Sequence, residues 1–264
     1  MTCVFERVLL MTTLTRRSLA SIGLLMAITG GAVFAQPAQP TIRSVTFYTI
    51  KADRVGDYLA AVKELAALRA KGGSERYSST WVSLSGPREY AVVTHHSKWA
   101  EFDIIPDPKM QSMAGQVSAL FARINNTVES SRRVVYSLES ELSLPLPSGD
   151  PQPLARVLRT WVKPDQLAAY RALVKSDLLP AAKKAGNKIY SVSRARMGSS
   201  NYEYSTVTGM DKWADLDGEA PLITAMGGQA AYDKFLLKLR TMVTRSEYEV
   251  YRFLKDQSYM PPVQ

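Results

Sequence analysis

Cysteine and histidine are nearly absent from this sequence of 264 residues, which contains one cysteine, Cys3, and two histidines. A single cysteine excludes an intrachain disulfide and a cysteine-based zinc or iron–sulfur site. The loop acids lack the spacing of a calcium-binding loop, so we expect no metal site. The fold must therefore be stabilised by the burial of apolar side chains.

Long hydrophobic runs are absent except near the N terminus, where Arg16 and Arg17 precede an apolar stretch from Leu19 to Ile28. Residues 33–35, Val-Phe-Ala, place small side chains where a signal peptidase needs them. This layout predicts a signal peptide over residues 1–35 and a periplasmic or secreted protein, exported by the general or the twin-arginine route. The alternative is a retained N-terminal anchor, for which the stretch is short.

Acidic residues are fewer than basic ones, 24 against 33, which gives a net charge of +9. An exported protein meets no genomic DNA, so we expect no nucleic-acid partner and no stable membrane insertion after cleavage. The charge instead favours solubility and attraction to anionic surfaces or ligands.

The rest of the sequence repeats itself. Three blocks recur in the same order, at offsets of 112, 114 and 115 residues: 51–63 with 163–175, 96–103 with 210–217, and 128–136 with 243–251. Such a pattern predicts a duplicated domain. We place the first repeat at residues 41–141, a proline-rich linker at 142–153 and the second repeat at 154–258.

Each repeat predicts the same order of elements. A β-branched strand (45–50, 157–162) precedes an amphipathic helix, for which Asp53 and Asp165 are the expected N-caps. Two strands joined by a tight turn follow (79–84 and 90–94; 189–197 and 202–208), then a second helix and a last strand (133–138, 248–253). The order βαββαβ is that of a ferredoxin-like unit. We therefore predict an α+β fold in which two tandem repeats dock sheet to sheet as an intrachain pseudo-dimeric α/β barrel.

This order, together with the Lys-Trp-Ala-acid-apolar-Asp block at residues 98–103 and 212–217, resembles the dimeric α/β-barrel superfamily. That superfamily includes antibiotic-biosynthesis-type monooxygenases, EthD-like and NIPSNAP-like proteins, stress-responsive barrels and chlorite dismutases. The resemblance spans about residues 41–258 and implies the fold rather than an activity. Its cyclases and monooxygenases generally carry a histidine on or just before the second helix, but residues 104–109 and 219–222 contain none.

The two histidines, His95 and His96, end the third strand of the first repeat, where the second repeat has Gly209 and Met210. His95 is a candidate general base, and an axial haem ligand is an alternative role. Haem-binding members of the superfamily need an axial histidine from a helix, so we expect no cofactor, with haem kept as an alternative. Solvent-facing polar residues at a strand end are the simpler interpretation. Adjacent strand residues point to opposite faces, so at most one of the two faces the barrel.

The second repeat carries arginines beside aromatic residues on shared strand faces, which suits a carboxylate or phosphate ligand with an aromatic part. The candidate ligand-binding residues are Arg159, Trp161, Arg194, Arg196, Tyr202 and Tyr204. In one alternative the opposite faces pack inward and the arginines are solvated. In another the arginines pair with Glu247 and Glu249 of the last strand.

The leading functional hypothesis is a protein that binds a small aromatic or anionic molecule between the sheets, either as a carrier or as a cofactor-independent enzyme. The alternative is a structural or interaction module whose barrel is filled by its own side chains. We expect a monomer, although sheet edges left free by docking would allow dimers. Trp99 and Trp213 occupy matching positions and are expected to anchor loops in the core.

Overall fold

The computed structural model describes residues 41–103, 107–147, 151–217 and 220–260. The predicted signal peptide, residues 1–35, lies outside the described residues, as do the middle of the proline-rich linker and the segment before the second helix. Residues Ala38–Gln264 form one compact unit. None of the helices in the described ranges combines the length and the hydropathy needed to cross a membrane.

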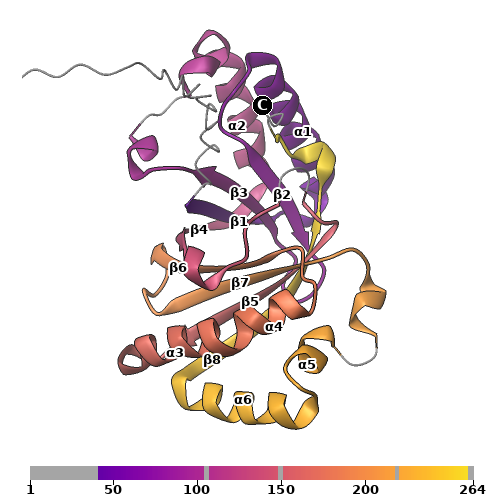
Figure 1. Cartoon of the computed structure of the whole chain (residues 1–264). Helices are drawn as coiled ribbons and strands as arrows, with labels where there is room; N and C mark the ends of the chain where they lie inside the picture. Colours follow the sequence, from indigo (N-terminus) through magenta and orange to yellow (C-terminus); the bar gives the residue numbers. More distant parts are fainter. Residues whose placement is uncertain (1–40, 104–106, 148–150, 218–219, 261–264) are drawn as a thin grey trace, which may run out of the picture. The chain divides into compact units, whose positions relative to one another are not determined.

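The described residues form a mixed α+β structure in which the order strand, helix, strand, strand, helix, strand occurs twice (Figure 1). The strands are β1 (Ile42–Ile50), β2 (Ser78–Ser83), β3 (Tyr90–His96), β4 (Val128–Leu138), β5 (Leu154–Val162), β6 (Tyr190–Met197), β7 (Glu203–Met210) and β8 (Val243–Phe253). The helices are α1 (Val55–Gly72), α2 (Ala114–Thr127), α3 (Leu167–Leu173), α4 (Leu179–Lys184), α5 (Pro221–Ala225) and α6 (Gln229–Met242). A π-helical turn, Val174–Leu178, joins α3 to α4.

All eight strands pair antiparallel in one closed barrel, in the order β1-β3-β2-β8-β5-β7-β6-β4. Two ladders, β2–β8 and β4–β6, join the strands of the first half to those of the second. Because the ring is closed, none of the described strands has a free edge. The expectation that free edges would remain for pairing between chains is therefore wrong.

The apolar side chains separate into three clusters, which identify the two faces of the sheet. One lies between β1–β4 and helices α1 and α2, and a second lies between β5–β8 and helices α3, α4 and α6. The third contains strand residues only: Phe47, Ala91, Val134, Tyr136, Ala195 and Tyr251. A cluster without helical members marks the inside of the barrel, and alternation along each strand then assigns the neighbouring side chains.

The first helix of each half begins differently from the prediction. Asp53 and Asp165 lie inside short 3-10 turns that start after Lys51 and Lys163, and neither turn has a side-chain cap. The end of α1 is closed by Gly73, at φ +62°, whose N–H donates to the carbonyl of Ala70. The capping prediction failed because a 3-10 turn supplies backbone bonds at the start of the helix.

The expectation that two tryptophans anchor loops in the core is wrong. Trp99 and Trp213 are 45% and 50% exposed, so neither is a core anchor. The first residues of the proline-rich segment are packed rather than free: Leu142 is buried in the second cluster, and the Ser143 hydroxyl accepts a hydrogen bond of 2.8 Å from the Val192 amide.

Candidate functional site

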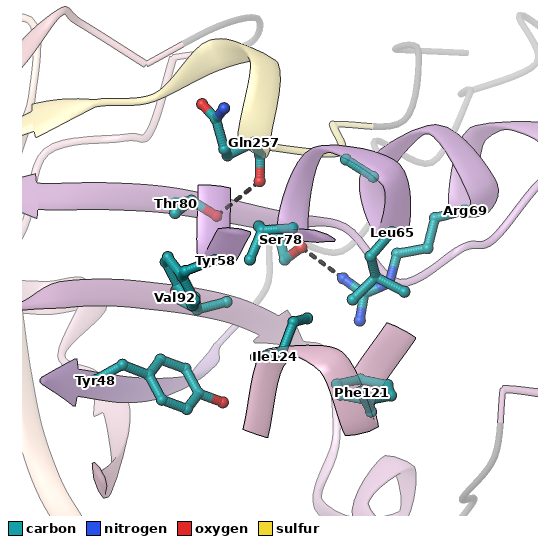
Figure 2. A pocket seen from close by; sticks show the side chains of 12 residues that line it. Tyr48, Tyr58, Leu65, Arg69, Ser78, Thr80, Val92, Phe121, Ile124 and Gln257 are labelled. Carbon is teal, nitrogen blue, oxygen red and sulfur yellow. Dashed lines mark hydrogen bonds between the residues drawn. The ribbon is translucent and has the colours of Figure 1, made fainter. Parts of the chain in front are cut away.

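A cavity of about 50 Å³ lies between the helix-facing side of β1–β3 and helices α1 and α2 (Figure 2). Its walls are mainly apolar, with Leu65 of α1 and Ile124 of α2 among them. Phe121, which is 41% exposed, is its most solvent-accessible aromatic neighbour. The space is too small for a whole organic molecule, so a ligand would place one end inside and extend outward.

Arg69, near the end of α1, brings a positive charge to this cavity. Its Nη1 donates a hydrogen bond of 2.6 Å to the Ser78 hydroxyl, as Figure 2 shows. None of the described carboxylates forms an ion pair with it, and burial lowers the pKa of the guanidinium, an effect that Asp107 partly opposes. A half-buried cation with a neutral partner is able to accept an anion.

Tyr58 of α1 supplies a second polar group. The side chain is fully buried, and its hydroxyl has no hydrogen-bond partner. Burial, with Tyr48 and Tyr90 close by, raises the pKa of this hydroxyl well above its usual range. The group therefore remains protonated at neutral pH and is free to donate to a ligand.

The sequence contains a signal for this site in the apolar face of α1. Tyr58, Val62 and Leu65 form the buried face of α1, and Arg69 extends the same face by one turn. A basic residue on an apolar helical face is unusual. In the second half, Ala181 stands 112 residues after Arg69, and the space below α3 is packed with Tyr170, Tyr190 and Tyr204.

The six candidate ligand-binding residues do not come together in one site. Arg159 and Trp161 lie on the inner face of β5, whereas Tyr204 belongs to the cluster on the helix side. Arg194 and Arg196 alternate with the inward Ala195 of β6 and so point to the other face, and Tyr202 is an exposed residue just before β7. The reason is that a shared face within each strand does not tell which face is turned inward.

Arg159 is buried and already neutralised. Its Nη2 lies 2.6 Å from Glu249 Oε2 and 3.8 Å from Glu247 Oε2, the pairing considered above as the alternative to ligand binding. Burial disfavours its charge, but Glu249, with smaller contributions from Tyr251, Tyr136 and Glu89, outweighs burial and raises the pKa. Trp161 is covered by the guanidinium of Arg245, which is centred 4.7 Å from the indole ring. These contacts fill the position assigned to a ligand.

Two tyrosine–glutamate bonds cross the inside of the barrel. The Tyr136 hydroxyl of β4 donates to Glu203 at 2.6 Å, and the Tyr251 hydroxyl of β8 donates to Glu89 at 2.7 Å. Each bond joins the last strand of one half to a glutamate at the start of the third strand of the other, Glu203 in β7 and Glu89 just before β3. The sequence analysis missed them, although Glu89 and Glu203 are 114 residues apart and the tyrosines 115, the same offsets as the repeats.

The histidines lie on opposite faces of β3. His95 faces inward and stacks on Tyr77 with ring centroids 4.8 Å apart, whereas His96 packs against Phe102 with its Nδ1 3.3 Å from Glu101. Burial, followed by the charges of Arg43 and His96, lowers the pKa of His95 to about 3. His95 is therefore neutral at pH 7, but a base this weak abstracts protons poorly.

Haem does not fit the residues that are present. None of the described helices carries a histidine, and both histidines lie on β3. His95 is enclosed by the barrel and by Tyr77, and His96 by Phe102 and Glu101. Among the described residues, no three His, Cys, Asp or Glu side chains gather in a way that would hold a metal ion.

The sequence matches no family model, and it matches no curated protein. Solved structures do match the fold. They include a presumed monooxygenase from Lactobacillus acidophilus NCFM, at 10% identity and TM-score 0.57, covering 84% of this chain and 97% of the other. An anthrone oxidase-like protein matches at 11% identity and TM-score 0.54, covering 81% and 92%.

A chlorite dismutase from Candidatus Nitrospira defluvii, in complex with imidazole, matches at 14% identity and TM-score 0.50, covering 83% of this chain and 93% of the other. These neighbours are of the monooxygenase-like and chlorite dismutase types of dimeric α/β barrel. Because the identities are this low, the comparisons show a likeness of fold alone. That fold is an antiparallel barrel of the dimeric α/β-barrel type.

Proposed function

We propose that this protein binds a small, largely apolar organic anion, with its charged end in the cavity between β1–β3 and helices α1 and α2. The observation that carries the proposal is the half-buried Arg69, whose guanidinium donates to the neutral Ser78 hydroxyl. The leading hypothesis placed the ligand between the sheets, and the charge pairing of Arg159 argues against that position.

The lining of the cavity specifies the kind of ligand. Arg69 and the Ser78 hydroxyl form a donor pair for a carboxylate, and the unpaired Tyr58 hydroxyl offers a further donor. Apolar contact with Leu65 and Phe121 favours an aromatic or aliphatic body. A carboxylate with one apolar group, such as a benzoate, matches this arrangement.

The names of two structural neighbours support a small-molecule function, since one is a presumed monooxygenase and the other is anthrone oxidase-like. A reaction is not part of the proposal, because no nucleophile and base meet at the cavity in the described part of the chain. The proposed role is that of a carrier or sensor protein, and no bound cofactor is required.

The architecture behind this site is an intrachain pseudo-dimer, built from repeats at residues 41–141 and 154–258 that are joined by the linker at 142–153. The reciprocal bonds Tyr136–Glu203 and Tyr251–Glu89 support it, because a two-fold related interface makes each contact twice. Closure of the barrel within one chain makes a monomer the expected form.

Export belongs to the same proposal. Cleavage after Ala35 would release a periplasmic or secreted binding protein, as the N-terminal sequence predicts. N-terminal sequencing of the protein from the periplasmic fraction tests this, and the expected first residue is Gln36. An intact N terminus in the membrane fraction would favour the retained anchor instead.

Native mass spectrometry of the full chain is the first test of ligand binding, because a co-purified anion would appear as an added mass. Calorimetric titration with benzoate and octanoate follows, with benzyl alcohol as the neutral comparison. We expect the carboxylates to bind more tightly than the alcohol. Arg69→Gln should weaken carboxylate binding about ten- to a hundredfold, because a charge-assisted hydrogen bond is lost.

Arg54→Gln is the matched control, since Arg54 is an arginine outside the cavity that pairs with Asp57 at 2.8 Å. This variant should bind like the wild type. Equal affinity in wild type and Arg69→Gln, or no binding of any of the three probes, would contradict the proposal.

A structural or interaction module is the second candidate, and a specific observation favours it. The inside of the barrel holds a packed apolar cluster together with the buried Arg159–Glu249 ion pair. Under this candidate, none of the probes binds and Arg69→Gln changes only stability. The same titrations therefore separate the two candidates.

A further inference from the structure

The segment after the last strand folds in the same way in both halves. A 3-10 turn follows β4 at Ser140–Leu142, and another follows β8 at Lys255–Gln257, 115 residues further on. The earlier turn lies against β6 and the later one against β2. The segments that contain these turns, residues 139–144 and 254–259, therefore occupy equivalent places in the structure.

Matching hydrogen bonds hold the two segments. The Val192 amide of β6 donates to Ser143 Oγ at 2.8 Å, and the Thr80 amide of β2 donates to Ser258 Oγ at 2.9 Å. The residue after each serine also donates a backbone bond of 2.9 Å to its strand. Because the backbones make the same bonds, the side chains of corresponding residues leave the two segments in the same direction.

The last residue of the turn differs between the segments in both chemistry and burial. Leu142 is 1% exposed and packs between the sheet and the helices of the second half, in a cluster with Tyr170 and Val174. Its counterpart Gln257 lines the cavity at Arg69, and Figure 2 shows the amide end of its side chain turned away from Arg69. A leucine gains by turning inward, whereas an amide would lose hydrogen bonds to water there.

The strand residues next to this position differ in the same sense. Ser78 and Thr80 of β2 line the cavity. Tyr190 and Val192, which stand 112 residues later on β6, are buried in the second cluster together with Leu142. Larger or more apolar side chains thus fill in the second half the space that stays open in the first.

We propose that residue 257 sets the size of the ligand that the Arg69 cavity accepts, and that Gln257 keeps open the space that Leu142 fills in the other half. The inference rests on the proposed function, because it assigns a specificity-determining residue to that site. A glutamine at this place leaves room for the apolar body of the ligand, whereas a leucine takes that room. The C-terminal segment is then one wall of the binding site.

Titration of the full-length variant Gln257→Leu with benzoate tests the proposal. Benzoate should bind about tenfold or more weakly than to the wild type, because the leucine competes with the ring for the same space. Acetate has no such body, so its affinity should fall less than that of benzoate. An equal or larger fall for acetate would overturn the size argument, since it would place the disturbance at the arginine.

Gln257→Ser separates size from polarity. Serine is polar and too short to fill the cavity, so this variant should bind benzoate like the wild type. Loss of benzoate binding in Gln257→Ser would show that the ligand contacts the amide itself, and the proposal would then be wrong.

The melting temperature without ligand gives a result that does not depend on binding. Gln257→Leu should melt about 2 °C or more above the wild type, because the leucine enters an existing cavity. Asp256→Glu is the matched control, since it introduces the neighbouring residue of the other segment, Glu141. Asp256 pairs with Lys63 at 2.7 Å, as Glu141 pairs with Lys175 at 3.0 Å, so this variant should change neither benzoate affinity nor melting temperature.

Two further results would overturn the role of residue 257. One is a benzoate affinity of Gln257→Leu equal to that of the wild type. The other is a melting temperature of Gln257→Leu at or below that of the wild type. A wild type that does not bind benzoate would count against the proposed function instead, and the melting temperatures would still decide whether residue 257 controls the open space.

Discussion

Single residues decide which part of this barrel is suited to ligand binding. Arg69 donates to the neutral Ser78 hydroxyl, whereas Arg159 lies between the carboxylates of Glu247 and Glu249. Sequence reasoning recognised that arginines beside aromatic side chains suit an anion. Of the three arginines it named, Arg159 is compensated by carboxylates, and Arg194 and Arg196 bond to neutral groups away from the barrel interior. Pairing depends on neighbours from distant strands, and a strand pattern does not report those neighbours.

Tyr58→Phe is predicted to stabilise the protein. The hydroxyl of Tyr58 is buried without a partner, so its removal should raise the free energy of unfolding by about 1 kcal/mol, while binding of benzoate weakens. Urea denaturation measures the first effect. The matched variant is Tyr251→Phe, which loses a bond to Glu89 and should be destabilised by about 1 kcal/mol or more. Destabilisation of both variants alike would contradict the assignment.

His95 predicts a pH dependence of stability. Its folded pKa is about 3, below the value near 6.5 of an unfolded histidine, because of burial and the charges of Arg43 and His96. The unfolded chain therefore binds a proton first, and stability falls as pH decreases from about 6.5 towards 3. His95→Gln should flatten this part of the stability profile. Parallel profiles for wild type and variant would show that His95 does not titrate this way.

The elements themselves were largely predictable. The alternating strands and the three- and four-residue spacing in α1 led to the observed order, because local periodicity records which side of each element is buried. The first turn of each first helix was not predictable in this way. Asp53 and Asp165 suit an N-cap by residue type, but backbone bonds of the 3-10 turns take that role.

Two glycines at strand ends should respond differently to alanine. Gly198 follows β6 with φ +78°, and an added Cβ would collide with the carbonyl oxygen of Arg133. Gly198→Ala should therefore lower the free energy of unfolding by about 2 kcal/mol or more. At Gly209 the added Cβ meets only the flexible side chain of Gln152, so Gly209→Ala should cost less. Thermal unfolding compares the two, and a larger loss at Gly209 would contradict this argument.

At the scale of the whole molecule, the two halves have the same order of strands and helices but differ in the charge of their inward-facing side chains. Phe47 of the first half corresponds to Arg159 of the second, and Val134 corresponds to Glu249, at offsets of 112 and 115 residues. The sequence analysis placed the candidate ligand-binding residues in the second half. The proposed function places the site in the first half instead, because the extra charges of the second half neutralise each other.

This correspondence suggests a paired substitution. Glu249→Val alone leaves Arg159 buried without its main partner and should cost about 3 kcal/mol of stability. Adding Arg159→Phe gives the second half the residues of the first, and stability should return to within about 1 kcal/mol of the wild type, because apolar replacements of buried ion pairs are often neutral. Chemical denaturation of both variants checks this. A double variant no more stable than the single one would mean that the two positions are not equivalent.

Closure of the barrel also determines how the protein would aggregate. A closed ring offers no strand edge to another chain, so the intact barrel resists edge-to-edge aggregation. The ladder between β2 and β8 pairs only three residues on each strand, fewer than any other ladder of the ring. Thermal opening there would expose two hydrogen-bonding edges at once, in a chain whose core is still largely folded. The shelf life of a concentrated solution would then depend on this one ladder more than on the stability of either half.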